Sequence, residues 1–547
     1  MRMYANVRID CGAGVSSASV VSGESPFSKG PHMEELGFDY FARLDPGATA
    51  IIESGGRRCT RGELFGQVNR ISRALRARGL QRGDALAIVV PNVLEYLTIY
   101  MAATQIGMYV VPINWHLSPS EVAYILKDSG SKALVVHERL ASLIKATLAG
   151  TDRAPQVLVC IGETAGFTSL KDFMAGQDDS AIDDACVGRM LTYTSATTGT
   201  SKAISLPLED AGTALERSIR FRIAVGVDPQ MGHVHMCASM LYHAAPLEGS
   251  AVSLHMGHLL ILVDRWDPEM LLRLIQEHRV TNTFMVPTMF VRLLKLPPQV
   301  RERYEVQSLS FVIHSAAPCP VETKRQMIEW WGPILWETYG AAEGAGTIVN
   351  SQDWLRYPGS VGKPIPGSKI RILNDAGEEQ PCGTIGTVYL TRYTGDRFEY
   401  RGAPEKTRLA YRGDFFTAGD IGYLNEAGHL FICDRKIDMI ITGGMNIYSA
   451  EIERILVQHP RVADCAVFGV PDELMGEVVN AVIQPLPNVA PDARLTADIL
   501  KFMASHLSSI KVPRRVEYTS ELPRDPNGKL YKHRLREPYW QRLGRRI

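Results

Sequence analysis

The chain has 547 residues, of which 45% are hydrophobic and 22% charged, a composition typical of folded globular proteins. At about 100–200 residues per domain, this length predicts more than one hydrophobic core. The 59 basic residues balance 59 acidic ones. This balance argues against non-specific binding to nucleic acid or to an anionic membrane, but it does not exclude local basic pockets.

The cysteines and the apolar stretches point to an intracellular protein. Nine cysteines are scattered along the chain without a C-x-x-C pair, so neither a disulfide framework nor a zinc site is indicated. Reduced thiols in the cytoplasm are the plainest interpretation. The longest apolar stretch, 97–112, is interrupted by Gln105 and Gly107, which predicts a buried helix running into a strand and not a membrane span. Residues 1–32 lack the apolar segment of a signal peptide and are expected to be a disordered leader.

After this leader, short apolar runs alternate with helical patterns. Strands are predicted at 85–90, 133–136, 281–286 and 334–337, and helices at 62–78, 120–127 and 321–330. This alternation is typical of helices packed on mostly parallel sheets.

Residues 359–434 have a different pattern, with short β-rich runs separated by turn residues. They predict a small antiparallel sheet or barrel. A helix at 449–457 and strands at 462–467 and 478–483 then begin a new unit.

The sequence therefore predicts an α/β fold: a large N-terminal domain of two α/β subdomains plus a small β-barrel, hinged to a smaller α+β C-terminal domain. The predicted bounds are 33–434 for the N-terminal domain, 435–438 for the hinge and 439–547 for the mobile C-terminal domain.

Two segments that follow predicted strands are suited to nucleotide chemistry. Residues 191–202 combine small hydroxylated residues with Gly199 and Lys202, and could surround a polyphosphate, although the first glycine of a Walker A loop is missing. In 336–343, Tyr339 could stack on a base and Glu343 could hold Mg²⁺. Taken singly, residues 191–202 could equally be a solvated loop, and residues 336–343 are better explained as a surface turn.

Two further segments lie toward the C-terminus. Residues 413–451 contain Asp420, suited to a ribose diol, and Arg435, which could reach ribose or phosphate. Residues 522–529 form a turn that presents Lys529. Individually, these are ordinary turns.

In combination, the order and spacing of these segments resemble the adenylate-forming superfamily, which includes acyl-CoA synthetases, over about 36–536. Further matches lie at 240–246, 314–320 and 467–472. The resemblance implies an enzyme that makes an acyl-AMP from a carboxylic acid and Mg·ATP, releases pyrophosphate, and transfers the acyl group to coenzyme A.

The resemblance also implies roles for individual residues. Glu343 would be the Mg²⁺ ligand, and Lys529 would bridge the acyl carboxylate and the α-phosphate. Asp420 would bind the ribose, with Arg435 beside it. The C-terminal domain would then rotate and bring Gly443 and Gly444 to a pantetheine tunnel. The other nucleotide-binding residues would be Thr194, Ser195, Thr197, Thr198, Gly199, Lys202, Ser315, Ala316, Ala317, Glu337, Thr338, Tyr339 and Gly340.

His243 would lie at the mouth of the acyl pocket, near the carboxylate or the thiol; the alternative is a hydrogen-bonded core histidine. Small and apolar residues that could line this pocket would leave room for a bulky hydrophobic acid, although they could equally be ordinary core. They are Met240, Ala244, Ala245, Gly249, Val286 and Phe290.

The sequence departs from the family pattern at several positions. Ala342 stands where a threonine is usual, and Ile437 stands at the hinge where Lys or Asp is usual. The other departures are Ala196, Ser201, Ala203 and Ser315. Losing one hydroxyl contact costs about 0.5–1.5 kcal/mol, which slows an enzyme without abolishing its activity.

The leading hypothesis is an acyl-CoA synthetase that uses ATP, Mg²⁺ and CoA, acting on a fatty acid or on a bulky polycyclic acid of secondary metabolism. One alternative is an adenylating enzyme that loads a carrier protein. Another is a catalytically impaired AMP-binding regulatory protein. A homodimer is an assembly that the sequence allows, and no nucleic-acid partner is expected.

Overall fold

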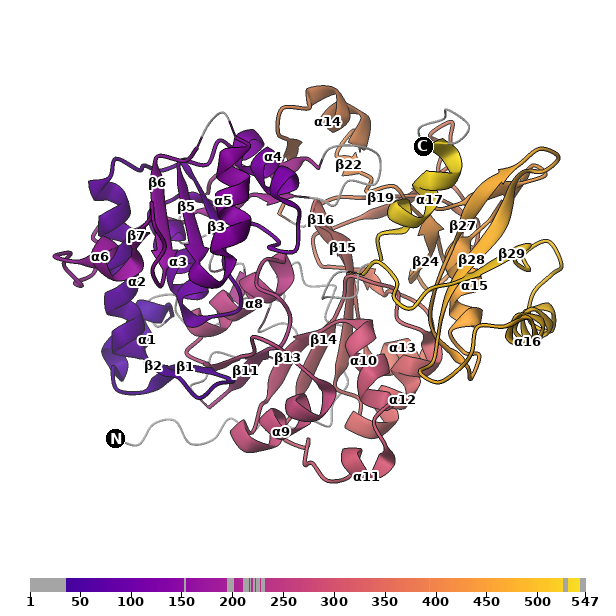
Figure 1. Ribbon diagram of the computed structural model, residues 1–547, viewed down its shortest axis with the longest axis horizontal. Helices are drawn as coiled ribbons and strands as arrows, with labels where there is room; N and C mark the ends of the chain where they lie inside the picture. Colours follow the sequence, from indigo (N-terminus) through magenta and orange to yellow (C-terminus); the bar gives the residue numbers. More distant parts are fainter. Residues whose placement is uncertain are drawn as a thin grey trace, which may run out of the picture.

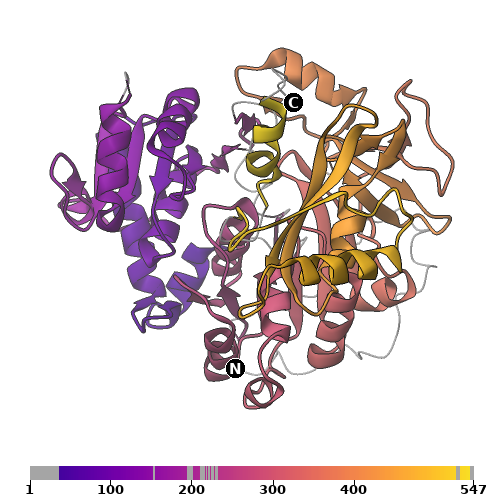
Figure 2. The same ribbon diagram turned by 45° about the vertical axis from the view of Figure 1, so that its right-hand side comes forward.

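The computed structural model describes residues 36–151, 154–193, 201–209, 216, 218–219, 222, 227, 232–392, 394–524 and 530–541. The expected leader, residues 194–200 of the phosphate loop, and Lys529 lie outside these ranges. Figure 1 shows the first α/β region at one end of the molecule and the C-terminal sheet at the other, and the turned view in Figure 2 agrees. The predicted α/β architecture with a smaller C-terminal domain is confirmed.

The first α/β region is built on a six-stranded parallel sheet in the order β7-β6-β5-β3-β4-β8. All five residues of β3 (Ala85–Val89) are buried, as expected for a parallel strand covered on both faces. The other strands are β4 Tyr109–Pro112, β5 Ala133–His137, β6 Val157–Ile161, β7 Thr168–Ser169 and β8 Arg189–Met190. The helices are α2 Arg61–Ala77, α3 Leu94–Thr104, α4 Pro119–Ser129, α5 Ala141–Ala149 and α6 Leu170–Met174.

The helices of this region start at strong local signals. Thr60 caps α2, and its hydroxyl accepts from the Glu63 amide while the Glu63 carboxylate accepts from the Thr60 amide. Ser118 and Glu121 form the same reciprocal pair at α4. Such capping boxes satisfy backbone donors that a helix start leaves unpaired, so both helix starts are determined locally.

A nine-stranded sheet forms the second region, in the order β17-β16-β15-β14-β13-β11-β12-β1-β2. Its central strands, from β15 to β1, are parallel, and β16, β17 and β2 are antiparallel. The strands are β1 Thr49–Glu53, β2 Arg58–Thr60, β11 Val234–Cys237, β12 Leu259–Leu262, β13 Asn282–Met285, β14 Phe311–His314, β15 Leu335–Ala341, β16 Gly344–Asn350 and β17 Lys363–Pro364.

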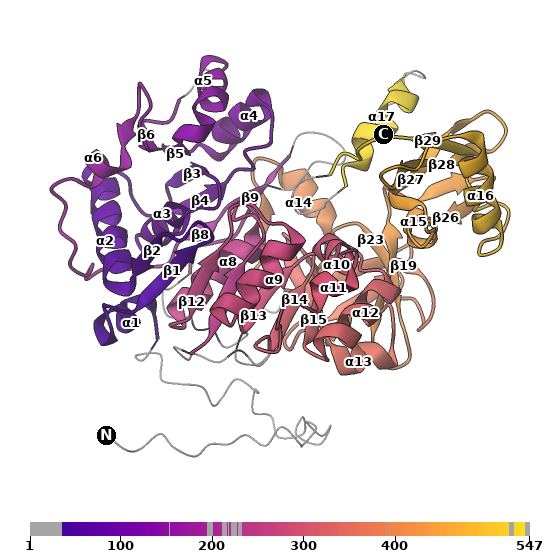
Figure 3. The same cartoon turned by 60° about the horizontal axis from the view of Figure 1, so that its bottom comes forward.

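Helices lie along this second sheet, as Figure 3 shows for α8, α9, α10 and α12. The helices are α1 Phe38–Leu44, α8 Ala244–His255, α9 Pro268–His278, α10 Pro287–Leu294, α11 Pro298–Arg301, α12 Val321–Trp331 and α13 Ser351–Arg356.

Two smaller sheets complete the N-terminal domain. A three-stranded sheet contains β9 Thr192–Tyr193, β10 Ala203–Ser205 and β20 Glu399–Tyr400. A six-stranded antiparallel sheet occupies the region predicted as a small sheet or barrel. Its strands are β18 Ile370–Leu373, β19 Gly386–Leu390, β21 Tyr411–Arg412, β22 Phe415–Phe416, β23 Asp420–Leu424 and β24 Leu430–Arg435, with α14 Pro404–Ala410 between β20 and β21.

The C-terminal region has its own five-stranded sheet, with its own hydrophobic cluster beneath it. The predicted hinge, 435–438, begins at the last residue of β24 and ends before β25. The strands are β25 Ile440–Thr442, β26 Met445–Ile447, β27 Val462–Asp472, β28 Gly476–Pro485 and β29 Arg515–Tyr518, and the helices are α15 Ser449–Leu456, α16 Ala493–Ala504 and α17 Lys532–Gln541.

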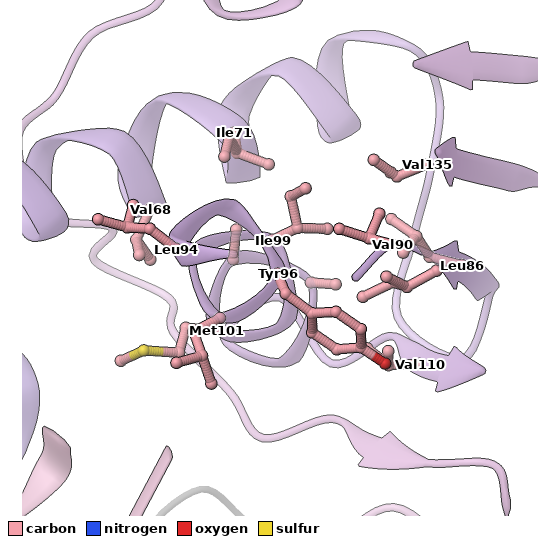
Figure 4. Packing of buried hydrophobic residues seen from close by; sticks show 14 of the residues in the cluster. Val68, Ile71, Leu86, Val90, Leu94, Tyr96, Ile99, Met101, Val110 and Val135 are labelled. Atoms are coloured by element: carbon pink, nitrogen blue, oxygen red, sulfur yellow. The ribbon is translucent and has the colours of Figure 1, made fainter. Parts of the chain in front are cut away.

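The apolar stretch 97–112 is a buried helix followed by a strand, as predicted. In Figure 4, side chains of α3, including Tyr96 and Ile99, pack against Leu86 of β3 and Ile71 of α2. Burial of each such side chain stabilises the fold by about 1.5–3 kcal/mol. Within the ranges described above, no helix is both long enough and apolar enough to cross a membrane.

Polar contacts connect the C-terminal region to the rest of the molecule. The Lys295 ammonium, just after α10, donates to the Ala463 carbonyl of β27 at 3.3 Å. Near the hinge, Lys436 pairs with Asp375 at 2.5 Å. Arg536 of α17 donates to the Ile437 carbonyl at 2.6 Å. The main chain of the apolar hinge residue is thus hydrogen-bonded to the last helix.

Candidate active site

Three predicted nucleotide-binding side chains meet where β15 passes the antiparallel sheet. Tyr339 of β15 donates its phenol proton to Asp420 Oδ2 at 2.6 Å. Arg435 Nε lies 3.5 Å from the other oxygen, Oδ1, since Asp420 and Arg435 are paired residues of β23 and β24. Burial, and secondarily the Asp420 carboxylate, raise the pKa of Tyr339 well above its usual value, so it stays a donor. The result is a buried carboxylate with one neutral donor and one cation, a set suited to a sugar diol.

Glu343 lies just beyond β15, and only 6% of its surface is exposed. Its Oε1 accepts a hydrogen bond from the Tyr400 phenol at 2.7 Å. Burial and the Glu343 carboxylate raise the pKa of Tyr400, so this phenol also stays protonated. The preceding residue, Ala342, is exposed.

Three neighbours of Glu343 were missed by sequence reasoning. Arg392 donates to the Glu343 carbonyl. Lys406 of α14 lies 4.2 Å from the Tyr400 ring centroid, and burial lowers the pKa of its ammonium. Tyr400, Arg392 and Lys406 come from segments without a recognisable motif.

Lys202 is held by α4 of the first α/β region. Its ammonium is 3.3 Å from Asp128 Oδ1 and 5.7 Å from the Tyr124 ring centroid, and these two side chains raise its pKa. Tyr124 also donates to the Ser201 carbonyl at 2.8 Å, and Tyr193 donates to Asp128 Oδ2 at 2.9 Å. Helix α4 thus holds both ends of the segment predicted to bind phosphates. Thr194, Ser195, Thr197, Thr198 and Gly199 lie in that segment, outside the described residues.

The predicted adenine-binding segment follows β14 and is bound to β15. The Ser315 hydroxyl donates to the Thr338 carbonyl at 2.7 Å. Ala316 has φ = 75°, in the left-handed region that favours glycine. Ala316 is exposed and Ala317 is partly exposed, and Gly340 stands at a register shift in the β15–β16 pair. The serine at 315 therefore ties these two segments together at a position where the family often has glycine.

Glu337 is engaged in a buried ion pair. Its Oε2 accepts from Lys324 of α12 at 2.7 Å, and His314 Nε2 lies 3.7 Å away. Burial raises the pKa of Glu337, and burial together with Lys324 lowers that of His314 well below its usual value. Any contact between Glu337 and a nucleotide would have to use its main chain or break this pair, so its predicted binding role stays a prediction.

The remaining predicted residues are spread over three places. His243 occupies the N-cap position of α8, and its ring lies 4.6 Å from that of Tyr242. Gly443 and Gly444 form the exposed turn between β25 and β26, where the Gly443 amide donates to the Met475 carbonyl at 2.8 Å. Lys529 belongs to a segment outside the described residues.

Mg²⁺ fits Glu343 as part of a shared site. The residues that the structure describes contain no group of three His, Cys, Asp or Glu side chains able to hold a metal alone. Mg²⁺ is commonly held by one or two carboxylates together with substrate phosphates and water. The single buried carboxylate of Glu343 meets this requirement when substrate phosphates and water supply the other ligands.

Family models match most of the chain. The AMP-binding enzyme model matches residues 38–394, and the AMP-binding enzyme C-terminal domain model matches residues 451–529. The chain therefore belongs to the AMP-binding enzyme family.

Individual relatives agree with this assignment. The chain is 32% identical to feruloyl-CoA synthase of Amycolatopsis sp., covering 91% of this chain and 97% of that one. It is 28% identical to the fatty acid–[acyl-carrier-protein] ligase ScoC of Streptomyces coeruleorubidus, covering 93% and 96%. The crystal structure of ATP-bound MatB from Rhodopseudomonas palustris superposes with a TM-score of 0.77 at 31% identity, covering 92% of this chain and 99% of that chain. The predicted family and the class of AMP-forming acid–thiol ligases are confirmed.

Proposed function

We propose that this enzyme activates a carboxylic acid with Mg·ATP and then transfers the acyl group to coenzyme A. A carboxylate oxygen attacks the α-phosphorus of ATP, the bond to the bridging oxygen breaks, and pyrophosphate leaves. The CoA thiol then loses its proton and attacks the acyl carbonyl carbon, and AMP leaves. The arrangement of Tyr339, Asp420 and Arg435 beside Glu343 is the observation that carries this proposal.

The residues of this chain have separate tasks in the first step. Asp420 receives the ribose hydroxyls, and Arg435 orients its carboxylate. Lys202 and the segment before it hold the leaving pyrophosphate, and Lys529 draws together the carboxylate and the α-phosphate, which would otherwise repel each other. Bound at Glu343, Mg²⁺ would neutralise charge on the phosphate oxygens.

The structure separates the residues that were predicted to line the acid pocket into buried and exposed ones. Val286 and Phe290 are almost completely buried in the core cluster that packs on the nine-stranded sheet. This favours the interpretation of both residues as ordinary core. Ala245, by contrast, is exposed on α8. We therefore expect the acid to lie along α8. The reaction would belong to lipid or natural-product metabolism in the cytoplasm.

The assignment of Lys529 is tested by separating the half-reactions. Lys529→Ala should reduce acyl-AMP formation far more than it reduces thioester formation from supplied acyl-AMP. Lys501→Ala, at an exposed position of α16 in the same domain, is the matched control. Equal loss in both steps would show that Lys529 does not have this role.

The acceptor and the activity itself are tested by two assays. Pyrophosphate release with a panel of acids should reveal at least one substrate; no release with any acid would favour an impaired AMP-binding regulatory protein. Free CoA and an acyl carrier protein should then be compared as acceptors. Transfer to the carrier alone would replace CoA ligation by the carrier-loading activity that is named for ScoC.

A further inference from the structure

One stripe of residues on helix α8 is exposed to solvent. Ala245 and Glu248 are exposed and Val252 is partly exposed, although most of the helix is buried. Positions three and four residues apart lie on one face of a helix, so this stripe is continuous. It is the face along which the proposed acid would lie.

Charged side chains connect this stripe to the nucleotide site. Although the Glu248 side chain reaches solvent, the surrounding protein raises its pKa, while Arg189, Arg392 and Arg222 act in the opposite direction. Arg392 is the residue that donates to the Glu343 carbonyl. Arg222 Nη2 approaches Gly249, the residue that follows Glu248. Because Arg392 and Arg222 both act on Glu248, we expect a molecule that lies along α8 with its carboxylate toward Glu343 to bring its other end near Arg222.

The absence of a side chain at Gly249 makes room for two polar groups. A Cβ atom at this position would lie 2.6 Å from Arg222 Nη2 and 3.9 Å from His235 Nε2. The guanidinium and the imidazole therefore point to the same spot on α8. Burial lowers the pKa of Arg222 only to about 10, so it stays a cation and a hydrogen-bond donor at neutral pH.

His235 supplies an acceptor at this spot. Its Nδ1 is 2.6 Å from Asn282 Oδ1, and Asn282 Nδ2 donates to Thr281 Oγ1, which fixes the orientation of the amide. Nδ1 must therefore carry the proton, and burial lowers the pKa of His235 to about 3, so the ring is neutral. Nε2 then has a bare lone pair. The side chain is 1% exposed, and Nε2 has no hydrogen-bond partner among the described residues.

We propose that Arg222 and His235 select an acid that carries a hydroxyl group at the end remote from its carboxylate. The hydroxyl donates its proton to His235 Nε2 and accepts from Arg222 Nη2. One hydroxyl group thus satisfies the buried His235 acceptor, which an alkyl or unsubstituted aryl end leaves unpaired. This proposal rests on the proposed function and names the class of substrate that the enzyme activates.

The test is an adenylation assay with matched pairs of acids, alkyl and aryl, with and without a hydroxyl at the remote end. Sites that hydrogen-bond a substrate hydroxyl strongly reject the analogue that lacks it. We expect kcat/KM to be at least about tenfold higher for the hydroxylated member of the preferred pair. Equal values within every active pair would overturn this inference while leaving the proposed function intact. No activity with any acid would instead remove the proposed function, and this inference with it.

Two variants locate the preference in these side chains. Arg222→Met removes the donor, and Gly249→Ala places a methyl group where the guanidinium lies. Each should lower kcat/KM for the hydroxylated acid about tenfold and leave the value for its unsubstituted partner nearly unchanged. Arg273→Met, at an exposed position on α9, is the matched control and should leave the ratio unchanged. If both variants reduced the two acids equally, the residues would be structural and not selective; circular dichroism would verify that each variant folds.

Discussion

The Asp420 carboxylate is where the largest single-residue effect is expected. Its two oxygens face a phenol donor and a guanidinium, at 2.6 and 3.5 Å. Asp420→Asn keeps the shape but removes the charge, and a hydrogen bond to a charged group contributes about 1.5–3 kcal/mol. We expect kcat/KM for ATP to fall about 10- to 100-fold.

Steady-state kinetics with varied ATP measure this effect. Asp179→Asn, which changes an exposed carboxylate paired with Arg70, is the control. An unchanged kcat/KM for ATP in Asp420→Asn would contradict the assignment of ribose binding to this residue.

Ala316 is a second residue with a defined expectation. Its φ of 75° costs an L-residue about 1–2 kcal/mol, whereas the same backbone is open to glycine, which loses up to about 1 kcal/mol in chain entropy. Ala316→Gly should therefore be neutral or stabilising by up to about 1 kcal/mol. Urea denaturation measures the change. Ala497→Gly, within helix α16, should be destabilising by about 0.5–1 kcal/mol. The same sign for both changes would refute this argument.

At the scale of elements, His255 of α8 forms the hydrogen bonds that attach α1 to α8. The Phe38 amide at the start of α1 donates to His255 Nδ1 at 3.2 Å, and the Gly37 amide donates to the His255 carbonyl at 2.9 Å. Burial lowers the pKa of His255 to about 4. Since the unfolded value is about 6.5, the stabilisation by the neutral ring is complete above pH 6.5 and is lost as the pH falls toward 4.

We therefore expect the attachment of α1 to weaken between pH 6.5 and 4, with faster hydrogen exchange at the amides of 38–44. His255→Asn should keep an acceptor without a titrating group, and should flatten this pH dependence. His506→Asn, an exposed histidine in the turn after α16, is the control. An unchanged pH dependence in His255→Asn would mean that another group controls α1.

Some helices and strands could be predicted from the sequence. The strands β3 and β5 and the helices α2 and α12 lie almost at their predicted bounds, because apolar periodicity and capping residues are local signals. Strand β27 was expected to end at Val467 but continues to Asp472. Gly469 and Pro471 are poor strand formers, and the strand persists through them because it pairs along its length with β28.

For the whole molecule, we predict that the arrangement of the two domains sets the balance of the half-reactions. Lys295 reaches from α10 to the Ala463 carbonyl of β27 at 3.3 Å. Lys295→Met removes this contact, and one such hydrogen bond contributes about 0.5–1.5 kcal/mol. The two domain orientations should shift in population accordingly.

We therefore expect Lys295→Met to change the rates of acyl-AMP formation and thioester formation in opposite directions, each by about two- to fivefold. Single-turnover measurements of the two steps test this. Lys132→Met, at a surface ion pair of the first α/β region, is the control. Parallel changes in both steps would show that the contact does not favour one orientation.

The sequence by itself determined the α/β class, the smaller C-terminal domain and the family, because these depend on local periodicity and on motifs whose residues are neighbours in the chain. Tyr339, Asp420, Arg435 and Glu343 were each identifiable in this way. The Asp420 carboxylate accepts a hydrogen bond from Tyr339 and pairs with Arg435. These contacts depend on the packing of β15 against β23 and β24.

Only the tertiary structure decided which side chains support this site. The supporting contacts join segments that are far apart in the chain. They are the hydrogen bond from Tyr400 to Glu343, the ion pair of Lys202 with Asp128, and the approach of Arg222 and His235 to Gly249. It also decided that the Glu337 carboxylate is paired with Lys324 inside the core. The physical reason is that such contacts arise from the packing of elements against one another, and a motif has no information about its partners across that interface.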